Sequence, residues 1–434
     1  MQYYSTNHLV KEVSLKEAVI KGLADDNGLF MPQFIRPLPQ SFFEHIDELS
    51  FSEIAFQVAR QLMGEDIPDA DLQKIVADTL TFDCPVVKVE EAIYALELFH
   101  GPTLAFKDVG GRFMARLLAY FLGHASRQVN VLVATSGDTG SAVANGFLGV
   151  PGIQVFVLYP QGLVSDIQEK QFTTLGQNIT AIEVGGHFDD CQRLVKQAFL
   201  DEQLRSSLLL TSANSINVAR FLPQSFYYFN AYARLKKQNK AGELVFAVPS
   251  GNFGNLTAGL IAKRMGLPVR RFLAANNVND VVYQYLQTGE YVPRSSVATI
   301  ANAMDVGDPS NFTRVLDLYA HSHEAVCADV SGFRYTDNQI RETVKTVYSN
   351  NHYLVDPHGA TAYRALKENL KAGETGVFLE TAHPAKFRET IETIIGEPVQ
   401  LPPKLAEFMK GTKQTVPMEN SFSAFKEFLL KTAK

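Results

Sequence analysis

Residues 129–142 read Val129-Asn-Val-Leu-Val-Ala-Thr-Ser-Gly-Asp-Thr-Gly-Ser-Ala142, and this stretch decides the fold class. Its valine-rich first half, Val129 to Thr135, predicts a strand, and the small polar residues after it predict a tight turn into a helix. From about Ala92 onward, the same order of short apolar run, turn rich in glycine, serine or asparagine, and amphipathic stretch recurs along the chain. This alternation predicts a mainly parallel sheet covered by helices.

Further strands are expected wherever a short β-branched or apolar run ends in a polar turn. A long aromatic helix is expected after Asn217, ending where the chain turns polar at Lys236. The N-terminal part differs, because Ser14 begins a helix-capping pattern and residues 51–63 carry apolar residues at helical spacing. The further expected strands are Ile93 to Phe99, Ile153 to Tyr159, Thr180 to Val184, Leu208 to Thr211, Leu244 to Val248, Arg270 to Ala274 and Val377 to Leu379.

These patterns predict an α/β fold with two open, mostly parallel, helix-covered sheet lobes and an N-terminal helical segment. A chain of 434 residues is too long for one ordinary hydrophobic core, which agrees with a division into lobes. We expect a mainly helical segment at residues 1–90, a first α/β lobe at residues 91–238 and a second α/β lobe at residues 239–434.

Composition excludes several classes of partner. The net charge is −6, and the 40 lysines and arginines form no basic block, so no nucleic-acid partner is expected. No apolar run is long enough to cross a bilayer, and the first residues lack a signal-peptide pattern, so no membrane partner is expected. The cysteines, Cys84, Cys191 and Cys327, are too scattered for a disulfide framework or a CxxC metal pair, which predicts a cytoplasmic protein without a metal site.

The first turn that carries chemistry is His100-Gly-Pro-Thr-Leu-Ala-Phe-Lys107-Asp-Val-Gly-Gly-Arg112, between an expected strand and an expected helix from Phe113 to Leu122. Near a helix start, the helix dipole opposes the ammonium charge of Lys107 and favours the neutral amine. A neutral lysine amine forms a Schiff base with an aldehyde. Taken alone, however, the motif favours a surface lysine that reaches solvent.

The second turn contains Ser136, Gly137, Asp138 and Thr139 after the strand at residues 129–135. Backbone amides and hydroxyl groups at such a turn can hold an anion, for example the carboxylate of a substrate. Serine, aspartate and threonine are also good helix caps. Both interpretations hold together, because the amides at a capped helix start are themselves part of an anion site.

The third turn is Val248-Pro-Ser-Gly-Asn-Phe-Gly-Asn255, which follows an apolar run. It matches neither the GxGxxG pattern nor the P-loop, but a glycine turn before a helix is a suitable cradle for one phosphate group. The fourth turn, Glu380-Thr-Ala-His-Pro384, follows the expected strand at residues 377–379. All four turns fall at the expected carboxyl ends of strands, where open parallel sheets bind ligands.

Taken together, these segments resemble threonine synthases, which are pyridoxal phosphate (PLP) enzymes of the tryptophan synthase β fold. The match includes the lysine segment at residues 100–108 and the three later turns, in the same order. Asp26-Asn-Gly-Leu-Phe-Met-Pro32 is similar to the N-terminal segment of the same family. The resemblance extends over nearly the whole chain and implies that PLP lies between the two sheet lobes.

The resemblance also implies roles for individual residues. Lys107 is expected to form the Schiff base with PLP, and Thr381 to face the pyridine nitrogen. A neutral threonine hydroxyl leaves the ring a weaker electron sink than an aspartate would, which favours elimination and replacement over transamination. The residues expected around the cofactor phosphate are Gly251, Asn252, Phe253, Gly254 and Asn255, and those expected beside the cofactor ring and the substrate carboxylate are Ser136, Gly137, Asp138 and Thr139.

The family reaction converts O-phospho-L-homoserine and water to L-threonine and phosphate, which makes this small molecule the expected substrate. Lys107 would also move protons at Cα and Cβ of the substrate. The substrate phosphate needs further donors, for which His100, Arg112, Asn217 and Arg220 are candidates, although Arg112 also fits a solvated helix position and Asn217 a helix cap. Alternative functions are a hydroxyamino-acid dehydratase, a phospho-lyase or a non-catalytic phosphometabolite-binding homologue.

Overall fold

The computed structural model describes residues 1–123 and 128–433. By its internal contacts the chain divides into two compact units, and neither is continuous in sequence. Unit 1 contains residues 31–106 and 221–400 together with Met1, and unit 2 contains residues 2–30, 107–220 and 401–434. The boundaries expected near residues 90 and 238 both fall inside unit 1.

Unit 1 is built on a six-stranded sheet with the order β12-β11-β10-β13-β5-β4. Only the edge pair of β4 and β5 is antiparallel, and the other neighbours are parallel. Since β5 pairs with β13, the start of the expected first lobe belongs to this sheet. The strands are β4 (Val86–Glu90), β5 (Ile93–Glu97), β10 (Glu243–Pro249), β11 (Val269–Asn276), β12 (Val330–Arg334) and β13 (Glu374–Glu380).

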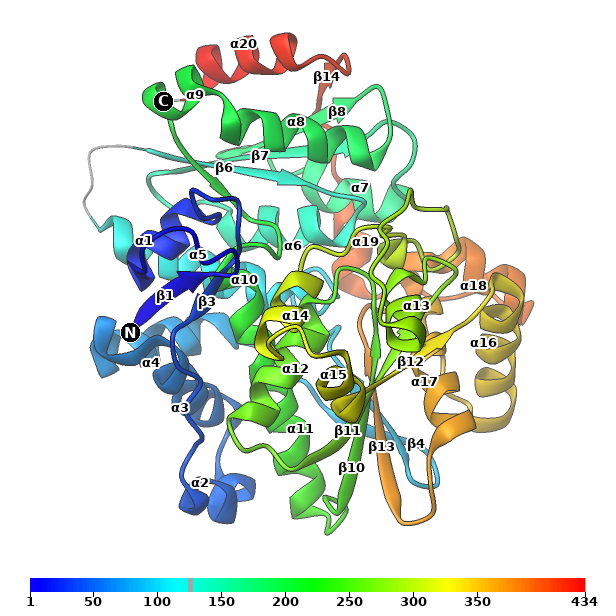
Figure 1. Ribbon diagram of the computed structural model, residues 1–434. Helices are drawn as coiled ribbons and strands as arrows, with labels where there is room; N and C mark the ends of the chain where they lie inside the picture. Colours follow the sequence, from blue (N-terminus) through cyan, green and yellow to red (C-terminus); the bar gives the residue numbers. More distant parts are fainter. Residues whose placement is uncertain (124–127, 434) are drawn as a thin grey trace. The chain divides into compact units, whose positions relative to one another are not determined.

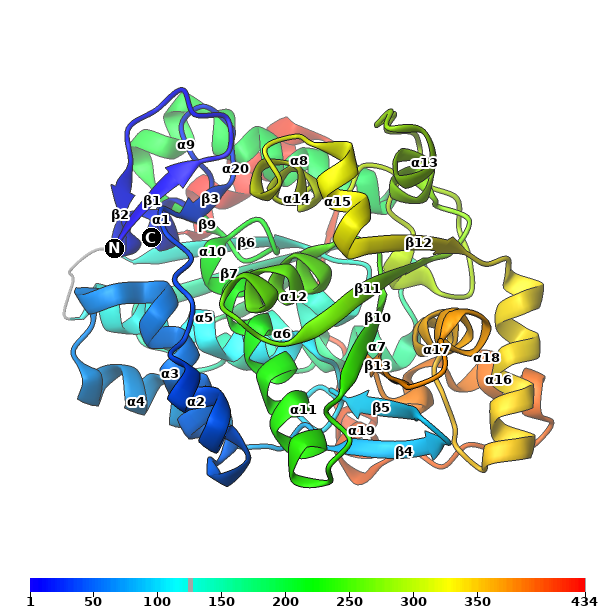
Figure 2. The same cartoon turned by 60° about the horizontal axis from the view of Figure 1, so that its bottom comes forward.

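Helices cover both faces of this sheet. In Figure 2, α12 and α17 lie on opposite sides of β10 and β11. Covering both faces explains why β10 and β13 are buried along almost their whole length and have apolar sequences without alternation. The helices of unit 1 are α2 (Gln40–His45), α3 (Phe51–Met63), α4 (Asp69–Thr79), α11 (Phe226–Lys237), α12 (Gly254–Arg264), α13 (Val281–Thr288), α14 (Phe312–Leu318), α15 (His323–Asp329), α16 (Asp337–Asn351), α17 (Pro357–Asn369) and α18 (Arg388–Ile395).

Unit 2 contains a five-stranded, fully parallel sheet with the order β14-β8-β7-β6-β9. Figure 1 shows α8 above β6 and β7, and α6 below them. The strands are β6 (Val129–Ala134), β7 (Ile153–Pro160), β8 (Ile179–Val184), β9 (Leu209–Ser212) and β14 (Val416–Met418). The helices are α1 (Leu15–Lys21), α5 (Lys107–Leu122), α6 (Asp138–Phe147), α7 (Asp166–Thr173), α8 (Phe188–Leu200), α9 (Glu202–Ser207), α10 (Val218–Phe221), α19 (Pro403–Lys410) and α20 (Phe422–Thr432).

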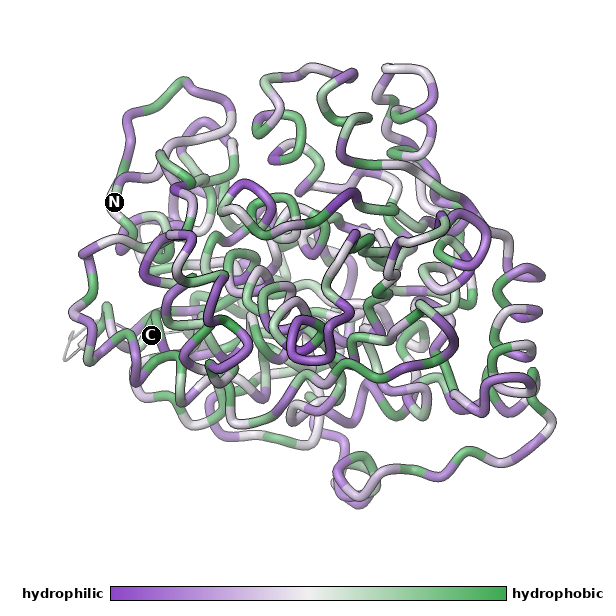
Figure 3. Tube along the Cα trace, turned by 90° about the horizontal axis from the view of Figure 1, so that it is seen from below, coloured by the Kyte–Doolittle hydropathy of each residue, from purple (hydrophilic) through white to green (hydrophobic). Residues whose placement is uncertain are grey.

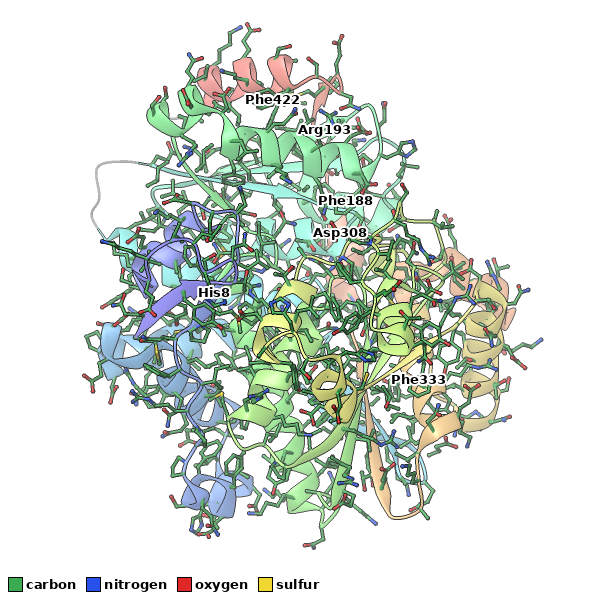
Figure 4. The ribbon with its side chains drawn as sticks, viewed as in Figure 1. His8, Phe188, Arg193, Asp308, Phe333 and Phe422 are labelled. Carbon is green, nitrogen blue, oxygen red and sulfur yellow. The ribbon has the colours of Figure 1, made fainter. Side chains whose placement is uncertain are left out.

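The C-terminal residues complete the core of unit 2. Phe425 and Leu429 of α20 are fully buried against Leu194 of α8 and its neighbours. Figure 4 labels Phe188, Arg193 and Phe422, which lie where α8 meets this C-terminal segment. Arg193 also donates a hydrogen bond to the side chain of Asn420. The C-terminal segment therefore packs as an integral part of this unit.

Every strand expected from the sequence is present, within two residues at each end except for β13, which begins at Glu374 instead of Val377. The N-terminal part was only partly predicted. Helices α1 and α3 begin after Ser14 and Ser50, whose side chains cap them, but the first residues also form the antiparallel pair β1 (Gln2–Ser5) and β2 (Val13–Ser14). These strands were missed because they are too short to show a two-residue alternation.

Other sequence expectations concern membranes, metals and cysteines. In the described residues no helix is long and apolar enough to cross a membrane, and Figure 3 shows polar and apolar residues alternating at short intervals. The described ranges also contain no group of His, Cys, Asp and Glu side chains that could hold a metal ion. Cys84, Cys191 and Cys327 are all free thiols.

Candidate active site

Three of the four turns singled out in the sequence follow neighbouring strands of the six-stranded sheet. Strand β13 lies between β10 and β5, and all three run parallel. The residues that follow them are Ser250–Asn255 after β10, Thr381 after β13 and the lysine segment after β5. Because carboxyl ends of parallel strands meet at one edge, these three motifs share that edge, as parallel-sheet ligand sites do.

Direct hydrogen bonds join the lysine segment to the residues after β13. The amide of Phe106 donates to the Thr381 carbonyl at 2.8 Å, and the amide of His383 donates to the Leu104 carbonyl at 3.0 Å. The buried Lys386 ammonium donates to the Thr103 carbonyl at 2.9 Å. The residue just before Lys107 is therefore fixed to the backbone of Thr381.

Lys107 is the first residue of α5. The helix expected from Phe113 to Leu122 therefore begins six residues earlier than predicted, because Gly110 and Gly111 lie inside the helix and not in a turn. Within unit 2, a Cβ atom at Gly111 would lie 2.8 Å from the Ala142 carbonyl oxygen, and one at Gly110 would overlap the Arg220 carbonyl. These glycines let α5 pack closely against neighbouring backbone, and this tertiary packing outweighs their low helix propensity. Lys107 thereby comes directly to a helix N-terminus.

The turn after β10 has the features of a phosphate cradle. Phe253 has a left-handed backbone, with φ 62°, and directly precedes α12. In the described part of the chain, the amides of Phe253, Gly254 and Asn255 donate to no protein acceptor. A Cβ atom at Gly251 would lie 2.7 Å from the Ala303 carbonyl oxygen, so only glycine fits this close approach. Unpaired amides at the N-terminus of a helix bind a single phosphate group well.

The two asparagines of this turn hold its shape. Asn252 Oδ1 accepts hydrogen bonds from the Ser310 amide at 2.8 Å and the Ser310 hydroxyl at 2.9 Å. Asn255 Nδ2 donates to the Pro249 carbonyl at 2.9 Å, and Asn255 Oδ1 accepts from the Leu256 amide at 2.9 Å. The Asn255 side chain is thus used within the turn, and only its backbone amide remains for a ligand.

Thr381 lies at the end of β13 and is 7% exposed. Within the described residues its carbonyl is hydrogen-bonded and its hydroxyl group is not. Nearby, His383 accepts a hydrogen bond from the Ala385 amide, and burial lowers the pKa of its imidazole to about 4. Thr381 therefore presents a neutral hydroxyl group, instead of a carboxylate, at the sheet edge that the three motifs share.

The fourth motif follows β6, in unit 2, and is organised by a residue that the sequence analysis did not single out. Thr135 Oγ1 accepts hydrogen bonds from the amides of Gly137 and Gly140 at 2.9 and 2.8 Å. Asp138 Oδ1 accepts from Gln168 Nε2 at 2.8 Å. Gly137 has φ 142°, and a Cβ atom there would lie 2.6 Å from the Gln168 side chain. The role of Thr135 could be inferred from the sequence, because threonine is a capping type of residue and lies at a strand end. The role of Gln168 could not, because Gln168 is distant in sequence from this turn.

Replacement of Thr135 by valine is expected to lower the free energy of unfolding by about 2 kcal/mol or more, because two buried amides lose their acceptor. Valine keeps the shape of threonine, so packing should change little. Chemical denaturation of the purified variant measures the change. Thr180→Val is the matched control, since among the described residues the Thr180 hydroxyl accepts only from the Gln154 side chain, at 3.1 Å. An equal effect in both variants would show that Thr135 does not organise the turn.

The four candidate donors for a substrate phosphate lie in different settings. Arg112 is half-buried in the second turn of α5. Arg220 is buried, donates to the Ala213 carbonyl at 2.8 Å and has its pKa lowered to about 10 by burial. Asn217 donates to the Val19 carbonyl at 2.9 Å and accepts from the Ala219 amide, so it serves as a structural cap. His100 lies 2.8 Å from Glu97.

Comparisons with known proteins agree with this arrangement. A family model described as pyridoxal-phosphate dependent enzyme matches residues 75–381. Two further models, described as threonine synthase N terminus and threonine synthase C-terminal, match residues 2–80 and 358–429. The fold is therefore that of a pyridoxal-phosphate dependent enzyme.

Similarity to known proteins over the full length of the chain shows which family of pyridoxal-phosphate dependent enzymes it belongs to. The chain is 47% identical to the threonine synthase of Haemophilus influenzae, with 100% of both chains covered. The crystal structure of the threonine synthase from Escherichia coli superimposes with a TM-score of 0.94 at 43% identity, over 99% of this chain and 100% of that one. The PLP-bound threonine synthase structure from Brucella melitensis gives 0.92 at 34% identity, over 99% and 98%. This chain belongs to the threonine synthase family.

Proposed function

We propose that this chain catalyses the conversion of O-phospho-L-homoserine and water to L-threonine and phosphate, as a carbon–oxygen lyase acting on phosphate. The observation that carries the proposal is the shared edge of β5, β13 and β10, where the lysine segment, Thr381 and the Gly251–Asn255 turn meet. The full-length relatives named above favour threonine synthase over a dehydratase, a phospho-lyase or a non-catalytic homologue.

The residues of unit 1 suit pyridoxal 5′-phosphate. The unpaired amides of Phe253, Gly254 and Asn255 would hold the cofactor phosphate, with Gly251 and Asn252 shaping the turn. Thr381 would place its hydroxyl group at the pyridine nitrogen. When bound, PLP supplies the electron sink that makes protons at the substrate carbons acidic enough to move. A neutral hydroxyl group at the ring nitrogen leaves that sink weaker than a carboxylate would.

Lys107 is the proposed attachment point and the proposed proton carrier. At the first position of α5 it faces the positive end of the helix dipole, which favours the neutral amine that both tasks need. Lys107 Nζ would hold the cofactor and, as a neutral amine, would remove the proton from Cα of the substrate and serve proton transfer at Cβ.

The turn after β6 is the proposed binding site for the substrate carboxylate. The half-buried hydroxyl groups of Ser136 and Thr139 are the proposed donors, and Gly137, whose amide donates to Thr135, is proposed to line the site with its backbone. Asp138 is proposed to lie beside the cofactor ring, with one carboxylate oxygen fixed by Gln168. Arg112 is the preferred donor to the substrate phosphate, because a guanidinium binds a phosphate in a bidentate fork.

The proposed partner is the small substrate, with neither nucleic acid nor membrane, and the proposed location is the cytoplasm. The scattered cysteines and the absence of a basic block in the sequence support this view.

The deciding experiment incubates the purified, PLP-loaded protein with O-phospho-L-homoserine and measures phosphate and threonine in the same sample. Equal amounts of both products are expected. L-threonine and L-serine, offered separately, test the dehydratase alternative through release of a 2-oxo acid. Release of phosphate without threonine would support a phospho-lyase and contradict the proposal. Absence of every product, despite bound PLP, would leave only a binding function.

A further inference from the structure

Two buried carboxyl groups lie beside the proposed cofactor site without a role in the steps above. Glu380 is the last residue of β13, directly before Thr381, and Asp356 caps the N-terminus of α17. Both are 0% exposed. The Asp356 amide donates to Glu380 Oε1 at 2.6 Å. A Cβ atom at Gly359 would overlap Glu380 Oε2, so the first turn of α17 leaves space for this carboxyl group.

The remaining oxygens indicate a shared proton. Glu380 Oε2 and Asp356 Oδ2 are buried without a hydrogen-bond partner in the described residues, and the hydrogen bond from the Asp356 amide holds the Glu380 carboxyl group next to Asp356. Two adjacent carboxylates without a compensating cation are strongly unfavourable inside a protein. Burial first, and then the charge of Asp356, raises the pKa of Glu380 well above its usual range. A proton on Glu380 Oε2 that is donated to Asp356 Oδ2 satisfies both oxygens.

Of the titratable groups around this pair, Glu97 favours the protonated state of Glu380. Glu97 of β5 accepts a hydrogen bond from the Tyr353 hydroxyl at 3.0 Å and lies 2.8 Å from His100. Its negative charge raises the pKa of Glu380 further. The titratable groups that face the pair are thus His358 from α17, Tyr353 before it, Glu97 and His100 from β5 and the loop after it, and His383 and Lys386 from the segment after β13.

A chain of hydrogen bonds continues from this pair to the phosphate turn. Asp356 Oδ1 accepts from the His358 amide at 2.7 Å and also from His358 Nδ1. His358 Nε2 accepts from the Ala303 amide at 3.1 Å, which fixes the ring proton on Nδ1. The carbonyl of Ala303 and the Cα of Met304 are the atoms against which Gly251 packs. His358 therefore holds the segment that supports Gly251.

We propose that Glu380 and Asp356 share one proton and act, through His358 and Ala303, as positioning residues that hold the Gly251 turn in place for the cofactor phosphate. The inference rests on the proposed function only in taking this turn as the phosphate site. The pair links the end of β13, which carries Thr381, to the turn after β10. It makes no direct contact with the substrate in this role.

The protonation is tested with Glu380→Gln in the PLP-loaded protein. Glutamine keeps a donor towards Asp356 Oδ2 but cannot ionise. A glutamate whose pKa is higher in the folded state than in the unfolded state stabilises the protein less as the pH rises. The reason is that the unfolded state releases its proton at a lower pH than the folded state does. The variant should therefore be at least as stable as the parent, and its advantage should grow with pH, by up to about tenfold in the unfolding equilibrium per pH unit above about pH 5.

Glu374→Gln on the same strand is the matched control. Glu374 forms a fork with Arg271 at 2.7 and 3.2 Å, and its pKa is lowered despite burial, by the hydrogen bonds that it accepts from Arg271 and the Lys371 amide. Its replacement should lower the melting temperature at neutral pH, where Glu380→Gln should not. A Glu380→Gln protein that melts lower than the parent, with a gap that widens as the pH rises, would show that Glu380 is ionised and overturn the proposal.

The positioning role is tested by the dissociation constant for PLP, measured by fluorescence titration. Glu380→Met removes the donor and should weaken PLP binding more than about tenfold, whereas Glu380→Gln should change it less than about threefold. Equal weakening by both would overturn the shared proton, and no change in either would overturn the positioning role. If Glu380→Met does not fold, His358→Gln takes its place with the same expected loss. Failure of the parent protein to bind PLP would instead overturn the cofactor site itself.

Discussion

Replacement of Lys107 by alanine is expected to lower turnover of O-phospho-L-homoserine by about a thousandfold or more, because one amine serves both attachment and proton transfer. The variant should also lose the visible absorbance of the Schiff base while remaining folded. Lys107 begins α5, and its backbone position depends on Phe106 and the glycines of α5, which stay intact. Visible spectra and product assays on the same preparation measure both effects.

Two control variants distinguish the effect of losing the reactive amine from the effect of losing a positive charge. Lys88→Ala removes an exposed lysine whose one ion pair within residues 1–123 and 128–433 is with Glu91, and should leave the spectrum and the turnover unchanged. Lys107→Arg keeps the positive charge but supplies no neutral amine, and should be as inactive as Lys107→Ala. A Lys107→Ala protein that keeps both the absorbance and the products would place the attachment at another lysine.

Replacement of Gly251 by alanine is expected to raise the dissociation constant for PLP by about tenfold to a hundredfold. The added methyl group would lie 2.7 Å from the Ala303 carbonyl oxygen and 2.9 Å from the Met304 Cα, and backbone atoms cannot yield as a flexible side chain can. The turn must therefore move, and the amides of residues 253–255 lose their common direction. Equilibrium titration of the cofactor-free protein with PLP measures the change.

Gly242→Ala provides the matched control for this substitution. Gly242 precedes the same strand, β10, and a Cβ atom there would meet no atom of the described part of the chain within 4 Å. The control should bind PLP as the parent does. Equal affinity of the Gly251→Ala protein would contradict the assignment of this turn to the cofactor phosphate, since the turn would then either tolerate the methyl group or lie away from PLP.

The strands were predictable from the sequence because each is a short apolar run that ends in a polar turn. Runs such as Val129–Ala134 and Leu244–Val248 are buried on both faces, and this burial demands apolar residues without alternation. The helices were less predictable. The aromatic segment after Asn217 is expected as one helix, but it is divided into α10, a 3-10 turn at Leu222–Ser225 that contains Pro223, and α11.

The site was predictable in its parts. The local sequence alone indicates the chemistry of the four turns, for example through a lysine before a helix or a glycine turn after a strand. The local sequence does not show that these turns lie together. In the sheet β13 lies between β10 and β5, although it is the last of the three strands in the chain. The same holds for Gln168 beside Asp138 and for Glu380 beside Asp356, whose pairing depends on how strands and helices pack.

The sequence by itself therefore determined the alternating α/β class, the four turns and their similarity to the threonine synthases, since these depend on residues that are close together along the chain. Only the tertiary structure decided that α5 begins at Lys107, that segments of three sequence regions form each unit, and that Glu380 and Asp356 are buried next to each other. The physical reason is that helix ends, strand order and the protonation of buried groups depend on close packing and desolvation by residues distant in sequence.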